Sequence, residues 1–209
     1  VDELRTKVAT TNFVTVLGPS GCGKSSLAYA GVANTLLHVD QQGVGRWEHV
    51  HFRPYKDPLF YLSHALVELL EPKFNFREKG KEARLWAKGM VNDEVDISQL
   101  LDAWHQQHMD VAYVLLIVDQ FEEVFHQCPD DDERQAFFRI LMKIITSDWI
   151  KVVLTLRADY WGHVLDEPLL SDSAIKGMVN FVDMTPEELR QAIERPALET
   201  GRRFDPGLV

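Results

Sequence analysis

The chain has 209 residues, of which 45% are apolar, and a formal net charge of −10. This length and composition support one sizeable hydrophobic core, or a core with part of a second lobe. The acidic balance, without a long cluster of lysine or arginine, argues against duplex DNA or an anionic membrane as a partner. Because the chain has no apolar run of about 18 residues and no charged-then-apolar leader, we expect no membrane span, no secretory signal and a cytoplasmic location.

The most informative stretch is a short apolar run that leads into a glycine-rich loop, residues 13–26, FVTVLGPSGCGKSS. It contains G-x-x-x-x-G-K-S, the pattern of a phosphate-binding loop between a buried strand and a helix. A polyphosphate must be met by backbone N–H groups, and only a loop free of bulky side chains brings them close. We therefore predict nucleotide binding by the residues of this loop: Gly18, Pro19, Ser20, Gly21, Cys22, Gly23, Lys24, Ser25 and Ser26.

Two side chains of this loop have more specific expected roles. Lys24 is expected to place its charge on the β- and γ-phosphates, and Ser25 to offer its hydroxyl to Mg²⁺. Residues 13–17 are β-branched and aromatic, as in a buried strand, and residues 24–37 lack proline and predict a helix. Because both flanks fit, a glycine turn that binds nothing is the weaker interpretation.

Between this loop and the next motif, the pattern predicts a strand at residues 47–52 and a helix at residues 58–70. Pro58 would occupy the first position of that helix. Residues 71–96 are charged and interrupted by glycine, which predicts an irregular surface insertion. Helical spacing returns at residues 97–108.

The second motif is residues 112–125, AYVLLIVDQFEEVF. Its continuous apolar run fits a parallel strand covered on both faces, and Asp119 follows it where P-loop enzymes hold Mg²⁺. The next position, often a glutamate in hydrolytic P-loop proteins, is Gln120, which can orient water but is no base. Either Glu122 or Glu123 must then serve as the base, or hydrolysis is slow. The alternative is that both are exposed acids on a helical turn.

Residues 133–146 have an apolar stripe at helical spacing, and residues 151–156, KVVLTL, predict a strand that ends just before Arg157. The alternation of strands and helices predicts right-handed crossovers and a parallel sheet with its ligand at the carboxyl ends of the strands. Arg157 would lie at that edge, where a cation can sense a γ-phosphate. A surface ion pair with Asp159 is the plain alternative.

The chain ends with a predicted fifth strand at residues 178–182 and a capping box at residues 185–188 that starts a helix. We therefore expect a P-loop domain over residues 1–183 and the beginning of a helical lid over residues 184–209. The first residues look helical without a cap, and the lid breaks off, so we expect the chain to be part of a longer protein.

Five stretches together resemble the nucleotide-binding domain of STAND signalling ATPases, of the bacterial novel-STAND type often joined to WD repeats: GPSGCGKSSL, RPYKDPLFYLSHAL, LLIVDQFEEVF, VVLTLRADYWGHVL and MTPEELRQAIERPALETG. The resemblance implies an α/β fold related to AAA+ ATPases, a three-layer P-loop NTPase with a five-stranded parallel sheet of order 5-1-4-3-2. It implies ATP and Mg²⁺ as ligands, an upstream effector, a downstream sensor and self-association on activation.

The same resemblance assigns roles to four further residues. Asp119 would be the Mg²⁺ aspartate, and Glu123 or Glu122 would orient water. Arg157 would be the sensor arginine. Our first hypothesis is therefore an ATPase switch in a multidomain signal-transduction protein, which could act in defence. A nucleotide-binding scaffold with negligible hydrolysis is the second, and a small-molecule kinase is the third because no acceptor-site motif is present.

Overall fold

The computed structural model describes residues 2–33 and 45–181, together with isolated positions between 187 and 204. The predicted lid, residues 184–209, and its capping box lie outside the described part of the chain, apart from those positions. The division into a domain at 1–183 and a lid at 184–209 therefore stays a prediction.

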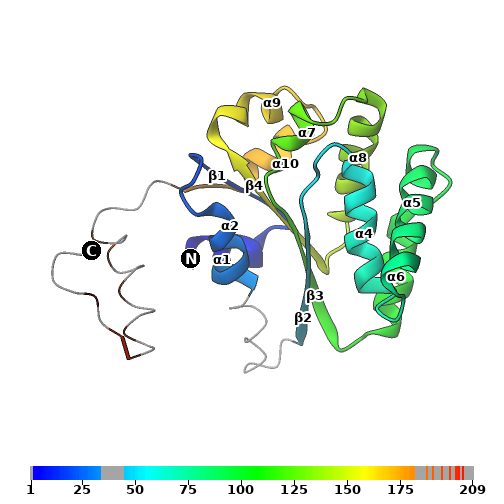
Figure 1. Ribbon diagram of the computed structural model, residues 1–209, viewed down its shortest axis with the longest axis horizontal. Coiled ribbons are helices and arrows are strands. Elements are labelled where there is room, and N and C mark those ends of the chain that lie inside the picture. Colours follow the sequence, from blue (N-terminus) through cyan, green and yellow to red (C-terminus); the bar gives the residue numbers. More distant parts are fainter. Residues whose placement is uncertain are drawn as a thin grey trace.

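Five strands in the described residues form one sheet: β1 (Phe13–Gly18), β2 (Arg46–Phe52), β3 (Val111–Val118), β4 (Ile150–Arg157) and β5 (Met178–Asn180). All neighbouring strands are parallel, and their order is β2-β3-β4-β1-β5 (Figure 1). This is the predicted order 5-1-4-3-2, counted from the opposite edge, so the predicted sheet is confirmed. All the strands consequently present their carboxyl ends at the same edge, which is where such sheets bind ligands.

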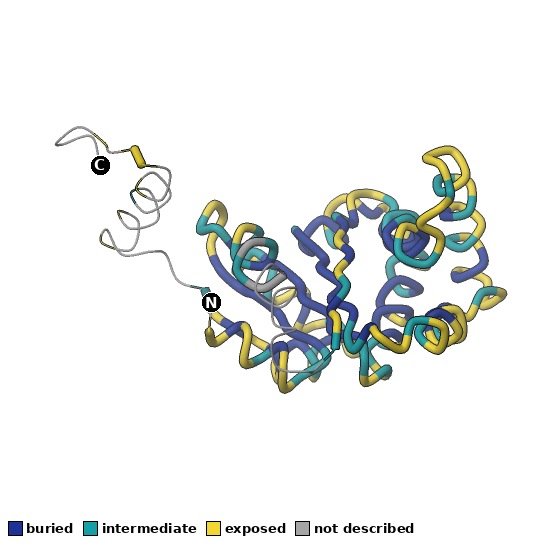
Figure 2. The backbone as a smooth tube through the Cα atoms, turned by 90° about the horizontal axis from the view of Figure 1, so that it is seen from below, coloured by how far each residue is buried: buried dark blue, intermediate teal, exposed yellow. Residues whose placement is uncertain are grey.

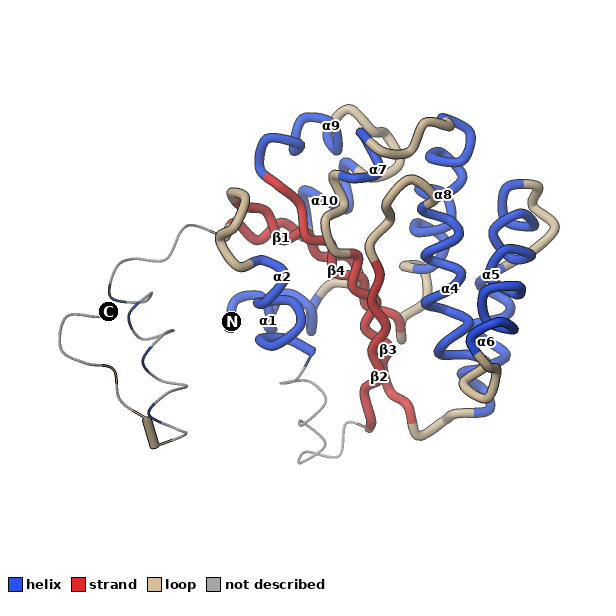
Figure 3. Tube along the Cα trace, in the orientation of Figure 1, coloured by secondary structure: helices blue, strands red, loops and turns tan. Residues whose placement is uncertain are grey.

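Helices cover both faces of the sheet, which gives the predicted three layers (Figure 3). One face carries α1 (Asp2–Thr10), α2 (Lys24–Ser26) and the π-helical segment Leu27–Ala33. The other face carries α4 (Pro58–Leu70), α5 (Phe76–Val91), α6 (Ile97–Gln107) and α8 (Asp131–Ile144). Short helical turns follow the carboxyl ends of β3 and β4: α7 (Glu123–His126), Ala158–Tyr160 and α9 (Trp161–Leu165). The short helix α10 (Ser171–Lys176) leads into the amino end of β5. None of these helices is long and apolar enough to cross a membrane.

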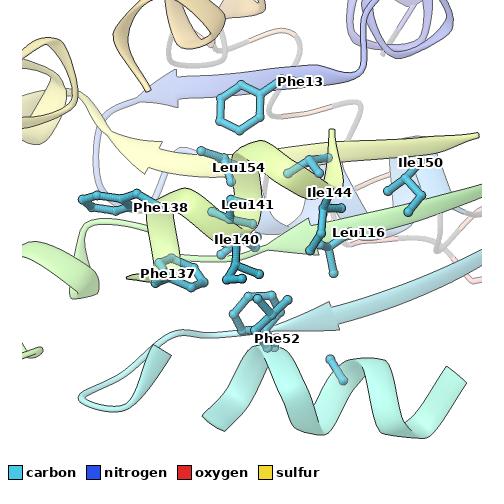
Figure 4. Packing of buried hydrophobic residues seen from close by; sticks show 14 of the residues in the cluster. Phe13, Phe52, Leu116, Phe137, Phe138, Ile140, Leu141, Ile144, Ile150 and Leu154 are labelled. Atoms are coloured by element: carbon cyan, nitrogen blue, oxygen red, sulfur yellow. The ribbon is translucent and has the colours of Figure 1, made fainter. Parts of the chain in front are cut away.

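The hydrophobic core lies on both sides of the central strands, which are buried along nearly their whole length (Figure 2). The larger cluster lies between the sheet and the α4, α6 and α8 helices, and the smaller one between the sheet and α1. In Figure 4, Phe137 and Ile144 of α8 lie over Leu116 of β3 and Leu154 of β4. Burial on two faces explains why these strands are continuous apolar runs in the sequence.

Aspartate side chains cap the amino ends of helices α4 and α8 and so determine where these helices begin. The Asp57 side chain accepts the backbone N–H of Phe60 ahead of Pro58, so α4 has the predicted bounds. Helix α8 begins two residues earlier than its apolar stripe alone predicts. The Asp130 side chain accepts two backbone N–H groups there, and the acidic residues that follow favour this end of a helix.

The predicted irregular insertion at residues 71–96 is wrong, because it contains the sixteen-residue helix α5. Asn75 and Glu78 form a capping box at its start. Its buried face is narrow and includes Ala83 and Met90, while its many charged residues face solvent. The glycine at position 89 favoured the prediction of a loop. In the structure it lies within the helix, where a larger side chain would collide with that of Val95.

The helix predicted at residues 24–37 differs in type from the helix in the structure. Three residues, α2, are α-helical, and the chain then continues as the π-helical segment Leu27–Ala33. Residues 34–37 lie outside the described residues. A π-helix is rare and is often found near functional sites.

Candidate functional site

The glycine-rich loop connects the end of β1 to α2 as predicted, and two of its glycines have left-handed backbones. Gly21 has φ +78° and Gly23 has φ +95°, conformations that strain other residues. Gly18 is restricted for a different reason, since a side chain there would collide with the backbone carbonyl of Phe181 just after β5. The loop conformation therefore depends on its glycines.

Lys24 is buried, with 8% of its surface exposed, and its ammonium group bends back over the loop. Its Nζ donates hydrogen bonds to the carbonyl oxygens of Gly18 at 2.9 Å and Pro19 at 2.5 Å. A third, longer hydrogen bond from Nζ goes to Cys22 Sγ at 3.9 Å, so all three donors of the ammonium group point at its own loop.

Ser25 and Asp119 meet below the loop, although they come from different strand–helix units. Ser25 Oγ donates a 2.7 Å hydrogen bond to Asp119 Oδ1. Thr155 Oγ1, from β4, donates to the same carboxylate oxygen at 2.5 Å. Asp119 is 5% exposed, so its carboxylate is held in place by two hydroxyl groups inside the protein.

Thr155 was missed in the sequence, although a signal for it exists. It is the polar residue within the otherwise apolar end of KVVLTL, and it is 1% exposed. Its hydroxyl also accepts the backbone N–H of Gln120 at 2.9 Å, and its carbonyl accepts that of Phe121. Thr155 thus fixes the chain immediately after Asp119.

Gln120 has φ +54°, a left-handed conformation that is uncommon for a residue other than glycine. Its side-chain oxygen accepts a hydrogen bond from Nη2 of Arg53, which follows β2. Strained backbones of this kind occur mainly where the surrounding structure enforces them, often at functional sites. Here the hydrogen bonds from Arg53 and to Thr155 enforce the turn.

Glu122 and Glu123 are both buried, with 6% and 4% of their surface exposed, which rules out the alternative of two exposed acids. Both carboxylate oxygens of Glu123 accept hydrogen bonds from other residues of the protein. Its Oε1 accepts from Arg53 Nη2 at 2.5 Å, and its Oε2 accepts the backbone N–H of Tyr55 at 3.2 Å. Arg53, which was not identified from the sequence, therefore connects the end of β2 to both Gln120 and Glu123.

Glu122 has a different environment, because in the described residues no cation pairs with it directly. Its Oε2 accepts the backbone N–H of Arg157 at 3.3 Å. Burial raises the pKa of Glu122 above its usual value, and hydrogen bonding together with the charges of Lys24 and Arg157 offsets this only in part. The carboxyl group of Glu122 lines the same cavity as the loop.

Arg157 lies at the carboxyl end of β4 as predicted, but its guanidinium group forms the alternative surface pair. Its Nε and Nη2 donate to the two carboxylate oxygens of Asp159 at 3.1 Å and 2.6 Å. This hydrogen bonding and the charge of Asp159 raise the pKa of Arg157. The side chain is 41% exposed and still borders the cavity beside the loop.

This cavity has a volume of about 330 Å³ and opens at the carboxyl edge of the sheet. Its lining comes from the loop and the start of α2, from the turn after β3 and from the end of β4: Ser20, Gly21, Gly23, Lys24, Ser25, Ser26, Gln120, Glu122, Thr155 and Arg157. The predicted Gly18, Pro19 and Cys22 belong to the loop but do not line this cavity, and Asp119 lies beneath Ser25. Glu123 is turned away toward Arg53.

The arrangement combines a glycine loop, a buried lysine, a hydroxyl–carboxylate pair and a buried acid around one cavity. Comparison with known proteins gives a consistent result. The whole chain, residues 1–209, matches the family described as Novel STAND NTPase 1. A search of curated proteins found no match.

Solved structures with the same fold are P-loop ATPases of low sequence identity. The ORC2 protein of Aeropyrum pernix, in ADPNP–ADP complexes, is 15% identical, with a TM-score of 0.60 over 94% of this chain and 51% of that chain. ORC1 of the same organism, in complex with DNA, is 16% identical, with a TM-score of 0.57 over 99% of this chain and 48% of that chain. A Walker-type ATPase of Pyrococcus abyssi is 11% identical, with a TM-score of 0.55 over 98% of this chain and 59% of that chain. The chain thus spans about half the length of these proteins.

Proposed function

This chain belongs to the Novel STAND NTPase 1 family, and we propose that it binds ATP with Mg²⁺ and hydrolyses it slowly as the switch domain of a larger signalling protein. The contact of Ser25 with Asp119 beneath the glycine loop carries the proposal. The signalling role, with an upstream effector, a downstream sensor and self-association on activation, rests on family membership alone.

The residues below the loop fit a magnesium ion. Mg²⁺ prefers oxygen ligands and usually keeps several waters, so that one or two protein oxygens suffice beside the phosphates. The Ser25 hydroxyl and the Asp119 carboxylate supply two such oxygens, and Thr155 fixes the carboxylate. When bound, the ion would neutralise charge on the β- and γ-phosphates.

The loop and Lys24 would hold the phosphates themselves. The Lys24 ammonium, which donates to carbonyls of its own loop, would donate to phosphate oxygens instead, because charged acceptors form the stronger hydrogen bonds. The ADPNP and ADP held by the ORC2 protein of the same fold support an adenine nucleotide as the ligand.

Glu122 is the residue that we propose orients the attacking water. It lines the cavity and has no direct ion pair in the described residues, whereas both oxygens of Glu123 are engaged by Arg53 and Tyr55. Burial raises the pKa of Glu122, and a higher pKa makes its carboxylate a stronger base. Because Gln120 fills the position next to Asp119, we expect turnover to be slow.

Arg157 would bind the γ-phosphate only after its ion pair with Asp159 breaks. The bidentate pair is exposed and therefore inexpensive to break, and a phosphate offers the guanidinium the same two-pronged geometry. The exchange would distinguish ATP from ADP, because ADP has no γ-phosphate to offer.

A nucleotide-binding scaffold with negligible hydrolysis is the second candidate. The observation that favours it is Gln120, a neutral amide hydrogen-bonded to Arg53 beside the cavity. The two functions make the same prediction for binding and differ in turnover, so both quantities are needed.

The experiment is calorimetric titration with Mg-ATP, followed by measurement of phosphate release, on the parent chain and on Lys24→Ala. We expect binding in the parent and none in the variant. Lys151→Ala is a matched control: Lys151 is 7% exposed, as buried as Lys24, but it lies near the amino end of β4 and should leave ATP binding intact. Equal ATP affinities of the parent and Lys24→Ala would refute the proposal, and binding without phosphate release would favour the scaffold.

A further inference from the structure

A second cavity, of about 560 Å³, lies at the outer edge of the sheet, away from the glycine loop. Edge strand β2 contributes its carboxyl end, α4 forms one wall, and Tyr29 of the π-helical segment reaches in from the other face of the sheet. In Figure 1, β2 lies at the edge of the sheet with α4 beside it. This cavity, which we term the edge pocket, is within the size range of small-molecule sites.

Aromatic and imidazole rings dominate the described lining of the edge pocket. Tyr61 and His64 project from one face of α4, and Tyr55 lies 4.9 Å from Tyr61 between ring centroids. Across the pocket, Tyr29 meets the ring of His51 edge-on at 5.0 Å. Such rings provide flat walls for a planar ligand, and their hydroxyl and imidazole groups provide hydrogen-bonding partners.

Arg53, whose Nη2 pairs with Glu123, places its guanidinium group at the end of the edge pocket next to the carboxyl end of β2. Its guanidinium carbon lies 4.9 Å from the centre of the Tyr55 ring, and the side chain is 35% exposed. The hydrogen bonds that it makes with described residues all use Nη2, and its Nε has no acceptor there. A guanidinium has five N–H donors. Because both hydrogen bonds use Nη2 and Nε is buried, the two N–H groups of Nη1 remain for an anion.

Glu68 and Tyr29 influence where a charged group of a ligand could lie in the edge pocket. Glu68 lies one turn beyond His64 on α4, at the opposite end from Arg53. The Tyr29 hydroxyl stays protonated, since burial and the charge of Asp119 raise the pKa of Tyr29 to about 12. A ligand with its anionic group at Arg53 and its ring between the tyrosines avoids Glu68 and can accept a hydrogen bond from Tyr29.

We propose that the edge pocket is a second binding site, for a small planar aromatic molecule that carries one anionic group. Its ring lies against Tyr55 and Tyr61, and its anionic group lies on Arg53. The site is distinct from the phosphate site, whose cavity shares no lining residue with it.

The test measures direct binding to the chain without nucleotide, so its outcome does not depend on ATP hydrolysis. Naphthalenesulfonate serves as the planar anionic probe and naphthalenemethanol as its uncharged counterpart, each titrated by calorimetry and by saturation-transfer NMR. We expect the sulfonate to bind about tenfold more tightly than the alcohol, and we expect Arg53→Gln to remove that difference. Saturating Mg-ADP should leave sulfonate binding in place.

Ring contact is tested with matched tyrosine variants. Tyr61→Leu keeps apolar volume for folding but loses the ring, and should weaken sulfonate binding about tenfold. Tyr113→Leu makes the same change on β3, at a tyrosine that packs on Trp47 and does not line the edge pocket, and should bind as the parent does. Absence of binding, displacement by Mg-ADP, equal affinity for the two probes, or equal losses in the two tyrosine variants would each overturn the proposal.

Discussion

Ser25 Oγ lies 2.7 Å from Asp119 Oδ1, although 94 residues separate the two in the sequence. The contact spans the sheet, because β4 lies between the loop strand β1 and the strand β3 that ends at Asp119. Thr155 of that intervening strand donates to the same oxygen. Residues at or just after the ends of β1, β3 and β4 therefore meet at one carboxylate. Each of these contacts can be tested by a separate substitution.

Thr155→Val should destabilise the fold and impair ATP turnover. The change keeps the shape of the side chain but removes a buried donor to Asp119 and an acceptor for the Gln120 N–H, which costs about 1–3 kcal/mol. Urea denaturation measures the loss. Thr15→Val is the control: Thr15 is also fully buried, but its hydroxyl has no hydrogen-bond partner in the described residues, so the variant should be neutral or stabilised. Equal destabilisation of both variants would contradict the role of Thr155.

Glu122→Gln should spare ATP binding and lower phosphate release by about 100-fold, the scale of general-base catalysis. The neighbouring Glu123→Gln is a matched change at a residue that pairs with Arg53 instead of facing the cavity. It should lower stability more than it lowers turnover. The two assays are phosphate release under saturating Mg-ATP and thermal denaturation. If the two variants exchanged these effects, Glu123 and not Glu122 would be the residue that orients water.

The sequence predicted the glycine loop and the strands because their signals are local: a fixed motif and apolar runs. The order of the strands was implied only by the resemblance to STAND ATPases. Helix α5 was missed because its buried face is narrow and its glycines imitate a loop. Thr155 and Arg53 were missed for a different reason. The hydrogen-bond partners of their side chains lie 35 to 70 residues away, so their roles follow only from which strand ends are neighbours in the folded sheet.

Arg157→Ala should weaken ATP more than ADP, by about tenfold or more, because only ATP offers a γ-phosphate to the guanidinium. Asp159→Ala should increase the preference for ATP over ADP, because it frees Arg157 from its bidentate pair. Both nucleotide affinities are measured by calorimetry in each variant. Arg134→Ala removes another exposed ion pair, with Asp131 on α8, and should change neither affinity. An equal loss for ATP and ADP in Arg157→Ala would remove Arg157 from the sensing role.

Stability should fall as the pH rises through neutrality, because of Glu133. Burial and the neighbouring Asp57, with which it shares a hydrogen bond, raise the pKa of Glu133 to about 7. In the unfolded chain this pKa would be near 4.3. The folded state therefore binds the proton more tightly, and its contribution to stability is complete below the unfolded value and lost as the pH rises past about 7.

Urea denaturation between pH 5 and pH 8 checks this dependence. Glu133→Gln should flatten the profile and stabilise the chain at the higher pH, since an amide cannot ionise. Glu3→Gln, which changes an exposed glutamate of α1, should keep the slope of the parent. A parent profile that rises over this range would contradict the assignment.

The most direct test of the account is the dependence of ATP affinity on Mg²⁺, measured by calorimetry with excess Mg²⁺ and with a chelator. Because Ser25 and Asp119 would hold the ion, the parent should bind ATP at least about tenfold more tightly with Mg²⁺. Asp119→Asn should lose this gain while keeping the affinity measured in the chelator. An Asp119→Asn variant that retains the full gain from Mg²⁺, or a parent that shows none, would contradict the assignment of this site.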